Sequence, residues 1–94
     1  MDVVWQEAAL DGLERARTYI AQHNPAAAQR VRQTILTAVS RLADHPNLGR
    51  PGRVEGTREL VIPGTRYIVA YAVLDDEVVI VAVQHTAQQW PDEF

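Results

Sequence analysis

The chain has 94 residues, of which 47% are hydrophobic and 22% charged, and these proportions predict one folded domain. It contains no cysteine, which excludes a disulfide framework and thiolate chemistry, and its three scattered histidines have no metal-ligand spacing. No apolar run approaches the ~20 residues that span a bilayer, and the acidic N-terminus lacks the basic region of a signal peptide. We therefore expect a cytoplasmic protein that contacts no membrane and holds no metal or cofactor.

The N-terminal half predicts one short strand and two helices. Residues 3–5 can form the strand. Apolar residues then recur at steps of three and four over 7–22 and again up to about residue 43, which predicts two amphipathic helices. Between them, Asn24 is a suitable helix cap, and Pro25 suits the first position of a helix. So short a turn predicts an antiparallel helical hairpin.

The C-terminal half predicts a loop followed by three strands. Glycines and prolines interrupt residues 45–56, after which the apolar period changes to that of strands at 58–62, 66–74 and 78–84. The tail from Thr86 carries Trp90. The sequence therefore predicts a single α+β domain over 1–94, with an N-terminal strand and a helical hairpin packed on a small antiparallel sheet, in the order β-α-α-β-β-β.

Both faces of the predicted sheet are apolar. In the longest strand, Tyr67 and Val69 alternate with Ile68 and Ala70, whereas a sheet with one wet face alternates apolar and polar residues. Two helices cover only one face. The second face is therefore either a surface for a partner chain or is covered by the tail, the loop and the small strand; the sequence leaves both possibilities open.

The net charge of −3 conceals an uneven distribution of charge. All nine basic residues are arginines, and seven of them lie between positions 30 and 66 with only three acids, so this segment carries +4 and the rest of the chain −7. Arginine stays ionised and binds anions through a planar fork of donors, so the segment predicts a surface that contacts something anionic. Glycine and proline shape the stretch that holds Arg50, Arg53, Arg58 and Arg66.

Several short motifs, in this order and spacing, resemble the RelE/ParE superfamily of toxins from bacterial type II toxin–antitoxin modules. They are Asn24 to Ala28, Gly49-Arg50-Pro51-Gly52, Gly56-Thr57-Arg58-Glu59-Leu60, Tyr67 to Tyr71, and Val83-Gln84-His85 ahead of Trp90. The resemblance covers nearly the whole chain and implies the same fold, a helical hairpin on a small antiparallel sheet.

The resemblance also implies partners. Toxins of this superfamily are neutralised by a small cognate antitoxin whose C-terminal segment wraps around the toxin. The surplus apolar sheet face would suit such a segment, so we expect it to contact Ile68, Ala70, Ala72 and Ile80. Operator DNA would be contacted only through the antitoxin.

The superfamily divides by target. RelE-like members cleave mRNA in the ribosome, whereas ParE-like members poison DNA gyrase and have no recognised nuclease site. Cleavage through the 2′-hydroxyl needs a base, an acid and cations, and arginine serves only the third role well. This chain has no lysine, and Ile68 stands where RelE-like members carry a strand arginine. Only Glu59 and His85 could act as acid and base, with Arg58 and Arg66 as cations.

These departures favour the ParE-like alternative, in which the chain inhibits DNA gyrase by binding and performs no covalent chemistry. The residues expected to contact the target are Arg50, Arg53, Arg58, Arg66 and Trp90. Two alternatives remain: a ribosome-dependent mRNA endoribonuclease, and an inactive relic that only binds its antitoxin. Each candidate acid or base also has a structural interpretation, in which Glu59 pairs with Arg58, Arg66 or another strand arginine and His85 is a half-buried strand-end residue.

Overall fold

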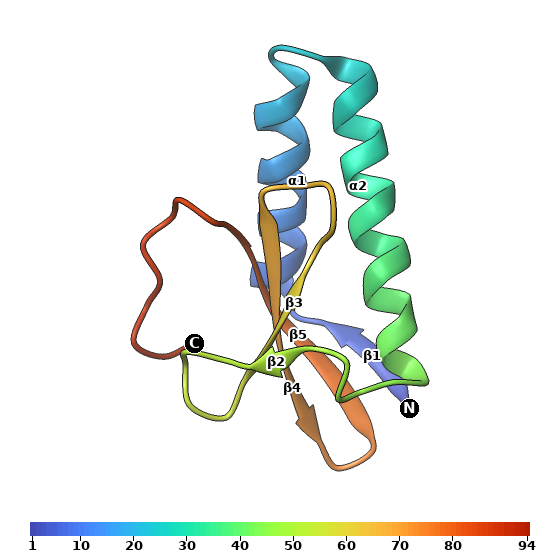
Figure 1. Ribbon diagram of the computed structural model, residues 1–94, viewed down its shortest axis with the longest axis vertical. Helices are drawn as coiled ribbons and strands as arrows, with labels where there is room; N and C mark the ends of the chain where they lie inside the picture. Colours follow the sequence, from blue (N-terminus) through green and yellow to red (C-terminus); the bar gives the residue numbers. More distant parts are fainter.

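Two helices lie on one face of a five-stranded sheet in the computed structural model, which describes residues 1–94 (Figure 1). The elements, in chain order, are β1 (Asp2–Trp5), α1 (Glu7–Ala21), α2 (Pro25–Ser40), a 3-10 turn η1 (Arg41–Ala43), β2 (Arg50–Pro51), β3 (Arg58–Val61), β4 (Tyr67–Leu74) and β5 (Glu77–His85). This order confirms the predicted α+β class. Neither helix combines the length and apolarity of a membrane span.

The sheet has the strand order β1-β5-β4-β3-β2, and its strands are antiparallel except for one pair. β1 runs parallel to β5, with Val3 opposite Val78. The predicted antiparallel pairing of the three hairpin-linked strands, β3 to β5, is confirmed, and β1, predicted only as a short strand packed on them, joins the same sheet in parallel. Local turn signals fix the direction of hairpin neighbours, but β1 and β5 are separated by most of the chain and no turn joins them.

The helices begin and pack where the sequence predicts. The Asn24 side chain accepts a hydrogen bond from the Ala27 amide at 3.1 Å, and Pro25 occupies the first turn of α2. α1 approaches β5 closely at Gly12, where an added Cβ atom would lie 2.9 Å from the Val83 carbonyl oxygen. A glycine is therefore required for this contact between helix and sheet.

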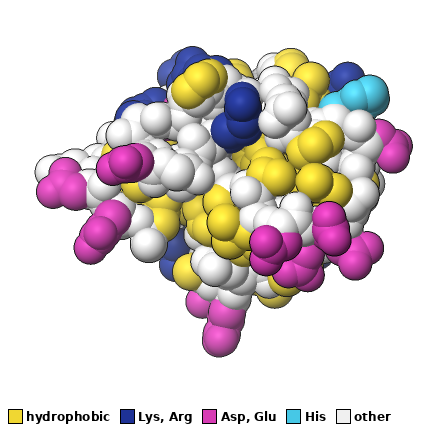
Figure 2. All heavy atoms as spheres, turned by 90° about the horizontal axis from the view of Figure 1, so that it is seen from below, with side chains coloured by type: hydrophobic (Ala, Val, Ile, Leu, Met, Phe, Trp, Pro, Cys, Tyr) yellow, Lys and Arg dark blue, Asp and Glu magenta, His cyan; other side chains and the backbone are white.

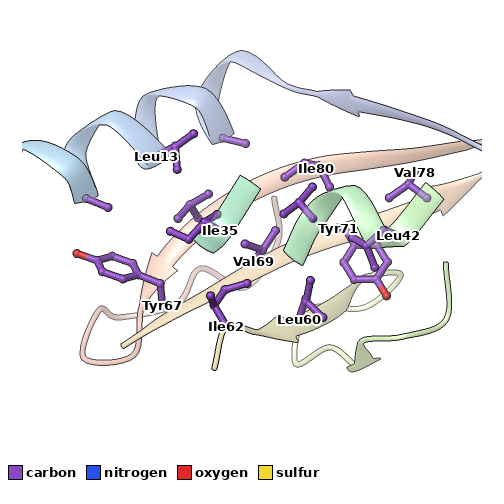
Figure 3. Packing of buried hydrophobic residues seen from close by; sticks show 14 residues of the cluster. Leu13, Ile35, Leu42, Leu60, Ile62, Tyr67, Val69, Tyr71, Val78 and Ile80 are labelled. Carbon is purple, nitrogen blue, oxygen red and sulfur yellow. The ribbon is translucent and has the colours of Figure 1, made fainter. Parts of the chain in front are cut away.

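The main core lies between the helices and the sheet (Figure 3). Side chains from the helices meet side chains from the strands there, and all of those that follow are at most 2% exposed: Leu13, Ile35, Val39, Leu42, Ile62, Val69, Tyr71, Val78 and Ile80. Burial of this continuous apolar cluster is the main force that holds the hairpin against the sheet.

A bulge in β5 changes which residues face the helices. Ala70 lies opposite Ala82, but the next residue, Tyr71, lies opposite Ile80, so Val81 has no partner in β4. Ile80 therefore joins Tyr71 on the helix-covered face, inside the core. The prediction that Ile80 lies beside Ile68 and Ala70 on the other face is wrong, because simple alternation does not anticipate the extra residue.

Candidate functional site

A buried carboxylate organises the arginine-rich segment. Glu59, on β3, is only 2% exposed, and its two oxygens bind two arginines that precede it in the chain. Arg50 Nη2 lies 2.9 Å from Oε1, whereas Arg53 Nε and the Arg53 backbone nitrogen lie 3.0 and 2.8 Å from Oε2. The loop between β2 and β3 thus folds around a single carboxylate, that of Glu59.

These contacts set the ionisation of Glu59. Burial by itself would raise the pKa of this carboxyl, but the hydrogen bonds and positive charge of Arg53, with the hydrogen bond from Arg50, outweigh burial and lower the pKa from 4.5 to about 2. Glu59 is therefore ionised at neutral pH, and each of its oxygens already accepts hydrogen bonds. A group in this state is poorly suited to give or take a proton during catalysis.

Of the partners predicted for Glu59, neither Arg58 nor Arg66 binds it, but another strand arginine, Arg50 of β2, does. Arg58 and Glu59 are neighbours on a strand and so point to opposite faces of the sheet. Arg58 Nη1 instead donates to the Gly49 carbonyl at 2.8 Å. The two arginines that bind Glu59 come from β2 and its loop, which the sequence predicts only as an irregular segment.

Tyr71 fixes the start of this loop. Its hydroxyl accepts a hydrogen bond from the Gly49 amide and donates one to the Pro46 carbonyl, each at 2.8 Å. The approach is so close that a Cβ atom on Gly49 would lie 2.7 Å from the Tyr71 ring. Arg50 follows directly, so its position depends on a buried residue of β4.

The C-terminal tail returns to the same loop (Figure 1). The Arg53 guanidinium carbon lies 3.9 Å from the centre of the Trp90 ring, which is a cation–π contact. The Trp90 ring also meets Phe94 edge-on, at 6.1 Å between centroids. Its indole N–H is buried and has no hydrogen-bond partner. Arg53 therefore contacts both the buried Glu59 carboxylate and Trp90 of the C-terminal tail.

This arrangement covers part of the sheet face opposite the helices. Glu59 lies opposite Ala70 on that face, Arg53 binds the Glu59 carboxylate, and the Trp90 ring packs against the Arg53 guanidinium. Ala70 is fully buried and Ile68 only 5% exposed. Two of the residues expected to contact an antitoxin, Ile68 and Ala70, are therefore internal, and of that set only Ala72 is half-buried.

The rest of that face is open near the β4–β5 turn. Val4, Val79 and Ala72 lie side by side across three strands, and Val4 is 40% exposed. Leu74, at the end of β4, is 56% exposed. Seen from this end of the molecule, exposed apolar side chains lie among acidic ones (Figure 2). Part of the apolar surplus predicted from the sequence thus stays exposed at this end.

His85 and Glu59 do not form an acid–base pair. His85 lies opposite Tyr67 on the helix-covered face, where the two rings meet edge-on with centroids 5.2 Å apart. Glu59 lies on the other face, two strands away. His85 Nδ1 already accepts a hydrogen bond from the Ala87 amide at 3.0 Å. It borders a hollow of about 840 Å³ beside α1 rather than the arginine-rich loop.

The predicted target-binding residues fall into separate groups. Arg50, Arg53 and Trp90 are joined through Glu59, as described. Arg66 is exposed in the turn before β4, and its side chain makes no ion pair. Tyr71 lies opposite Arg58, and Arg66 precedes Tyr71 by five positions. Arg66 is therefore separated from Arg58 by roughly 16 Å along the strand direction. No three histidine, aspartate or glutamate side chains gather as a metal site would require.

A second hollow, of about 340 Å³, runs along the outer edge of β3. Arg41, Leu48, Arg50 and Val61 line it, with Ala38 of α2 behind them. Leu48 and Val61, two large apolar side chains, are 42% and 47% exposed there. We refer to it below as the β3-edge groove. No sequence pattern predicts this groove, because its shape depends on where the chain leaves β2.

The fold is shared with a protein of a toxin–antitoxin complex. Superposition on a chain of the solved structure "Chromosomal ParDE TA system from P. aeruginosa" gives a TM-score of 0.83 and covers 90% of this chain and 95% of that one, with 23% sequence identity. This likeness concerns the fold alone.

Sequence relatives define the family. The model of the family described as "ParE toxin of type II toxin-antitoxin system, parDE" matches residues 3–90, and the chain belongs to this family. It is 46% identical to Y4kP of Sinorhizobium fredii over 93% of this chain and 90% of that protein. It is 38% identical to Toxin RelE2 of Caulobacter vibrioides over 92% and 96%, respectively. The protein is thus a toxin of a type II toxin–antitoxin system, and its family implies a cognate antitoxin.

Proposed function

We propose that the protein inhibits DNA gyrase by binding to it, without covalent chemistry, and that a cognate antitoxin neutralises it. Membership of the ParE toxin family supports the choice of target. Gyrase acts on chromosomal DNA, so the proposed site of action is the cytoplasm.

The observation that carries the proposal is the separation of Glu59 from His85. Cleavage of RNA needs an acid and a base on either side of one phosphate, and these two residues lie on opposite faces of the sheet. Glu59 also has a pKa of about 2 and is bound by two arginines. With no lysine in the chain, the arginines are left to bind rather than to transfer protons.

The contact surface proposed for the target is the loop from Arg50 to Arg53 together with Trp90, with Arg58 and Arg66 beyond it. Glu59 holds Arg50 and Arg53 in place, so their outward donors are ordered before binding, which lowers the entropic cost of association.

The test is a supercoiling assay with purified gyrase and toxin, run with variants of matched charge change. Arg50→Glu with Arg66→Glu should weaken inhibition at least tenfold. Arg15→Glu with Arg30→Glu, the same change of charge on the exposed surfaces of α1 and α2, should leave inhibition unchanged. Primer-extension mapping of mRNA after induction provides the opposing readout. If mRNA is cut at codon-linked positions and gyrase is unaffected, the proposal is wrong and the protein is an endoribonuclease. If neither assay responds, the protein is better explained as an inactive relic that only binds its antitoxin.

A further inference from the structure

The sheet face opposite the helices carries an apolar surface beside the β4–β5 turn. Two rows of side chains cross three strands there. One row is Val4, Val79 and Ala72, and the next is Asp2, Glu77 and Leu74. Exposed apolar groups therefore lie directly beside acids, as they do at this end of the molecule in Figure 2. We call this surface the end patch; it comprises Val4, Ala72, Leu74 and Val79 with the acids Asp2, Asp75, Asp76 and Glu77.

The four acids of the end patch have no basic partner. None of them belongs to an ion pair, and β1, β4 and β5 contain no arginine or lysine. Asp2 lies directly opposite Glu77, and like charges placed opposite one another destabilise a sheet. The fold by itself therefore gives no reason for both charges, whereas a basic partner would neutralise them.

The β4–β5 turn does not require its acids either. Asp75 has a φ of 52°, in the left-handed region that glycine adopts without strain and that asparagine tolerates as well as aspartate does. An uncharged residue would therefore serve this turn at least equally well. The charge of Asp75 adds instead to that of Asp76 and Glu77, which follow it in the chain.

The end patch continues the surface proposed for the target. Ala70 precedes Ala72 by two residues on the same face of β4 and lies opposite Glu59, the acid that holds Arg50 and Arg53. Residues two apart in a strand are separated by about 7 Å, so the arginine-bearing loop and the end patch are neighbours on one face. Together they form a surface that is positive at the loop and negative at the end patch.

We propose that the end patch binds a basic, partly apolar segment of gyrase. An apolar side chain of that segment packs against Val4, Val79 and Leu74, and its lysines or arginines pair with the acids around them. An enzyme that holds DNA presents basic surfaces to the phosphates, so charge complementarity favours such a segment. This inference rests on the proposed function and adds a second, acidic half to the target-binding surface.

The charge contact is tested by Asp75→Asn with Glu77→Gln, which removes two charges and keeps the shape of both side chains. At low salt, half-inhibition of purified gyrase in the supercoiling assay should need at least tenfold more of this variant, and the difference should shrink as salt rises. Urea unfolding should show equal or greater stability, because repulsion from Asp2 is relieved. Acids needed only by the fold would lower stability when replaced. Glu7→Gln with Asp11→Asn, the same change on the exposed surface of α1, should leave inhibition unchanged.

The apolar contact is tested by Leu74→Gln, which should weaken inhibition severalfold, with Leu10→Gln on the exposed surface of α1 as the matched control. A peptide tests the chemistry without gyrase. When a nine-residue peptide that alternates valine with lysine is titrated into the free toxin, the methyl NMR signals of Val4, Val79 and Leu74 should shift. The same peptide with glutamate in place of lysine should leave these signals where they are.

The gyrase assay separates this inference from the proposed function. If the wild-type toxin does not affect gyrase, the proposed function is wrong and this inference falls with it. If the wild type inhibits gyrase and the end-patch variants inhibit it equally well, this inference alone is wrong. Absence of methyl shifts with the lysine peptide also overturns it. Two further results refute it by assigning the end patch elsewhere: variants that inhibit gyrase but no longer bind the antitoxin, and variants that convert a toxin dimer to a monomer in sedimentation.

Discussion

The Tyr71 hydroxyl lies 2.8 Å from the Gly49 amide nitrogen and accepts its hydrogen bond inside the protein. The same hydroxyl donates to the Pro46 carbonyl, so one side chain of a central strand is hydrogen-bonded to both ends of the turn from Pro46 to Gly49. The positions of Arg50 and of the β3-edge groove follow from this anchor. Stability of the fold and geometry of the candidate site are therefore coupled at Tyr71.

Tyr71→Phe should destabilise the protein by about 2–3 kcal/mol, because it leaves the Gly49 amide and the Pro46 carbonyl without their buried partner. Urea unfolding followed by circular dichroism measures the change. Tyr19→Phe removes a hydroxyl from a ring that is 60% exposed and should cost almost nothing. Equal stability of the two variants would contradict the role given to Tyr71.

Acid should destabilise the protein through Glu59. The pKa of this carboxyl is about 2 in the folded chain and near 4.5 in the unfolded chain, so its ionised form favours folding. That contribution, roughly 3 kcal/mol, is complete above about pH 5 and is lost as the pH falls toward 2. In urea titrations at a series of pH values, Glu59→Gln should flatten this slope. Glu14→Gln, on an exposed helix surface, should leave most of the slope in place.

Gly12→Ala should destabilise the protein even though alanine favours helices. The new Cβ atom would lie 2.9 Å from the Val83 carbonyl oxygen, so α1 must move away from β5 at a cost of about 1–3 kcal/mol. Thr18→Ala, at an exposed position of the same helix, should be neutral or slightly stabilising. Thermal unfolding of both variants makes the comparison. A more stable Gly12→Ala protein would show that the close contact is not needed.

Arg53→Gln should loosen the C-terminal tail. The substitution removes a cation–π contact with Trp90, a contact that contributes about 1 kcal/mol, so tail opening should increase roughly fivefold. In a Trp5→Phe background, Trp90 is the only tryptophan, and its emission should shift to the red as it meets water. Arg66→Gln, which removes an arginine with no ion pair, serves as the control. Identical emission from both variants would argue against the contact.

Local sequence signals predict the elements of this fold well. The cap at Asn24 and the apolar periods of α1, α2, β4 and β5 lie where the structure has them. The parallel pairing of β1 could not be predicted in this way, because it joins segments that no turn connects. Nor could the bulge at Val81, which shifts Ile80 into the core. Both depend on how distant strands pack rather than on local pattern.

The residues of the candidate site could be predicted from the sequence, but their arrangement in space could not. The sequence indicates the arginines, Trp90 and an acid among them, and the structure joins Arg50, Arg53 and Trp90. It could not indicate which arginines bind Glu59, since the partners lie in a loop with no periodic pattern. The β3-edge groove depends on a single buried hydroxyl, that of Tyr71, which the sequence pattern predicts only as a core residue.

The order of the strands has a consequence for synthesis of the toxin. β5 is the last strand to be made, yet it lies between β1, the first, and β4. Val78, Ile80 and Val83 of β5 belong to the core, so a chain that stops before them lacks a central part of it. Folding must wait for the final quarter of translation, because these core residues of β5 are not made before then. An interrupted round of synthesis therefore releases an unfolded fragment, which is a substrate for proteases, rather than a partly active toxin.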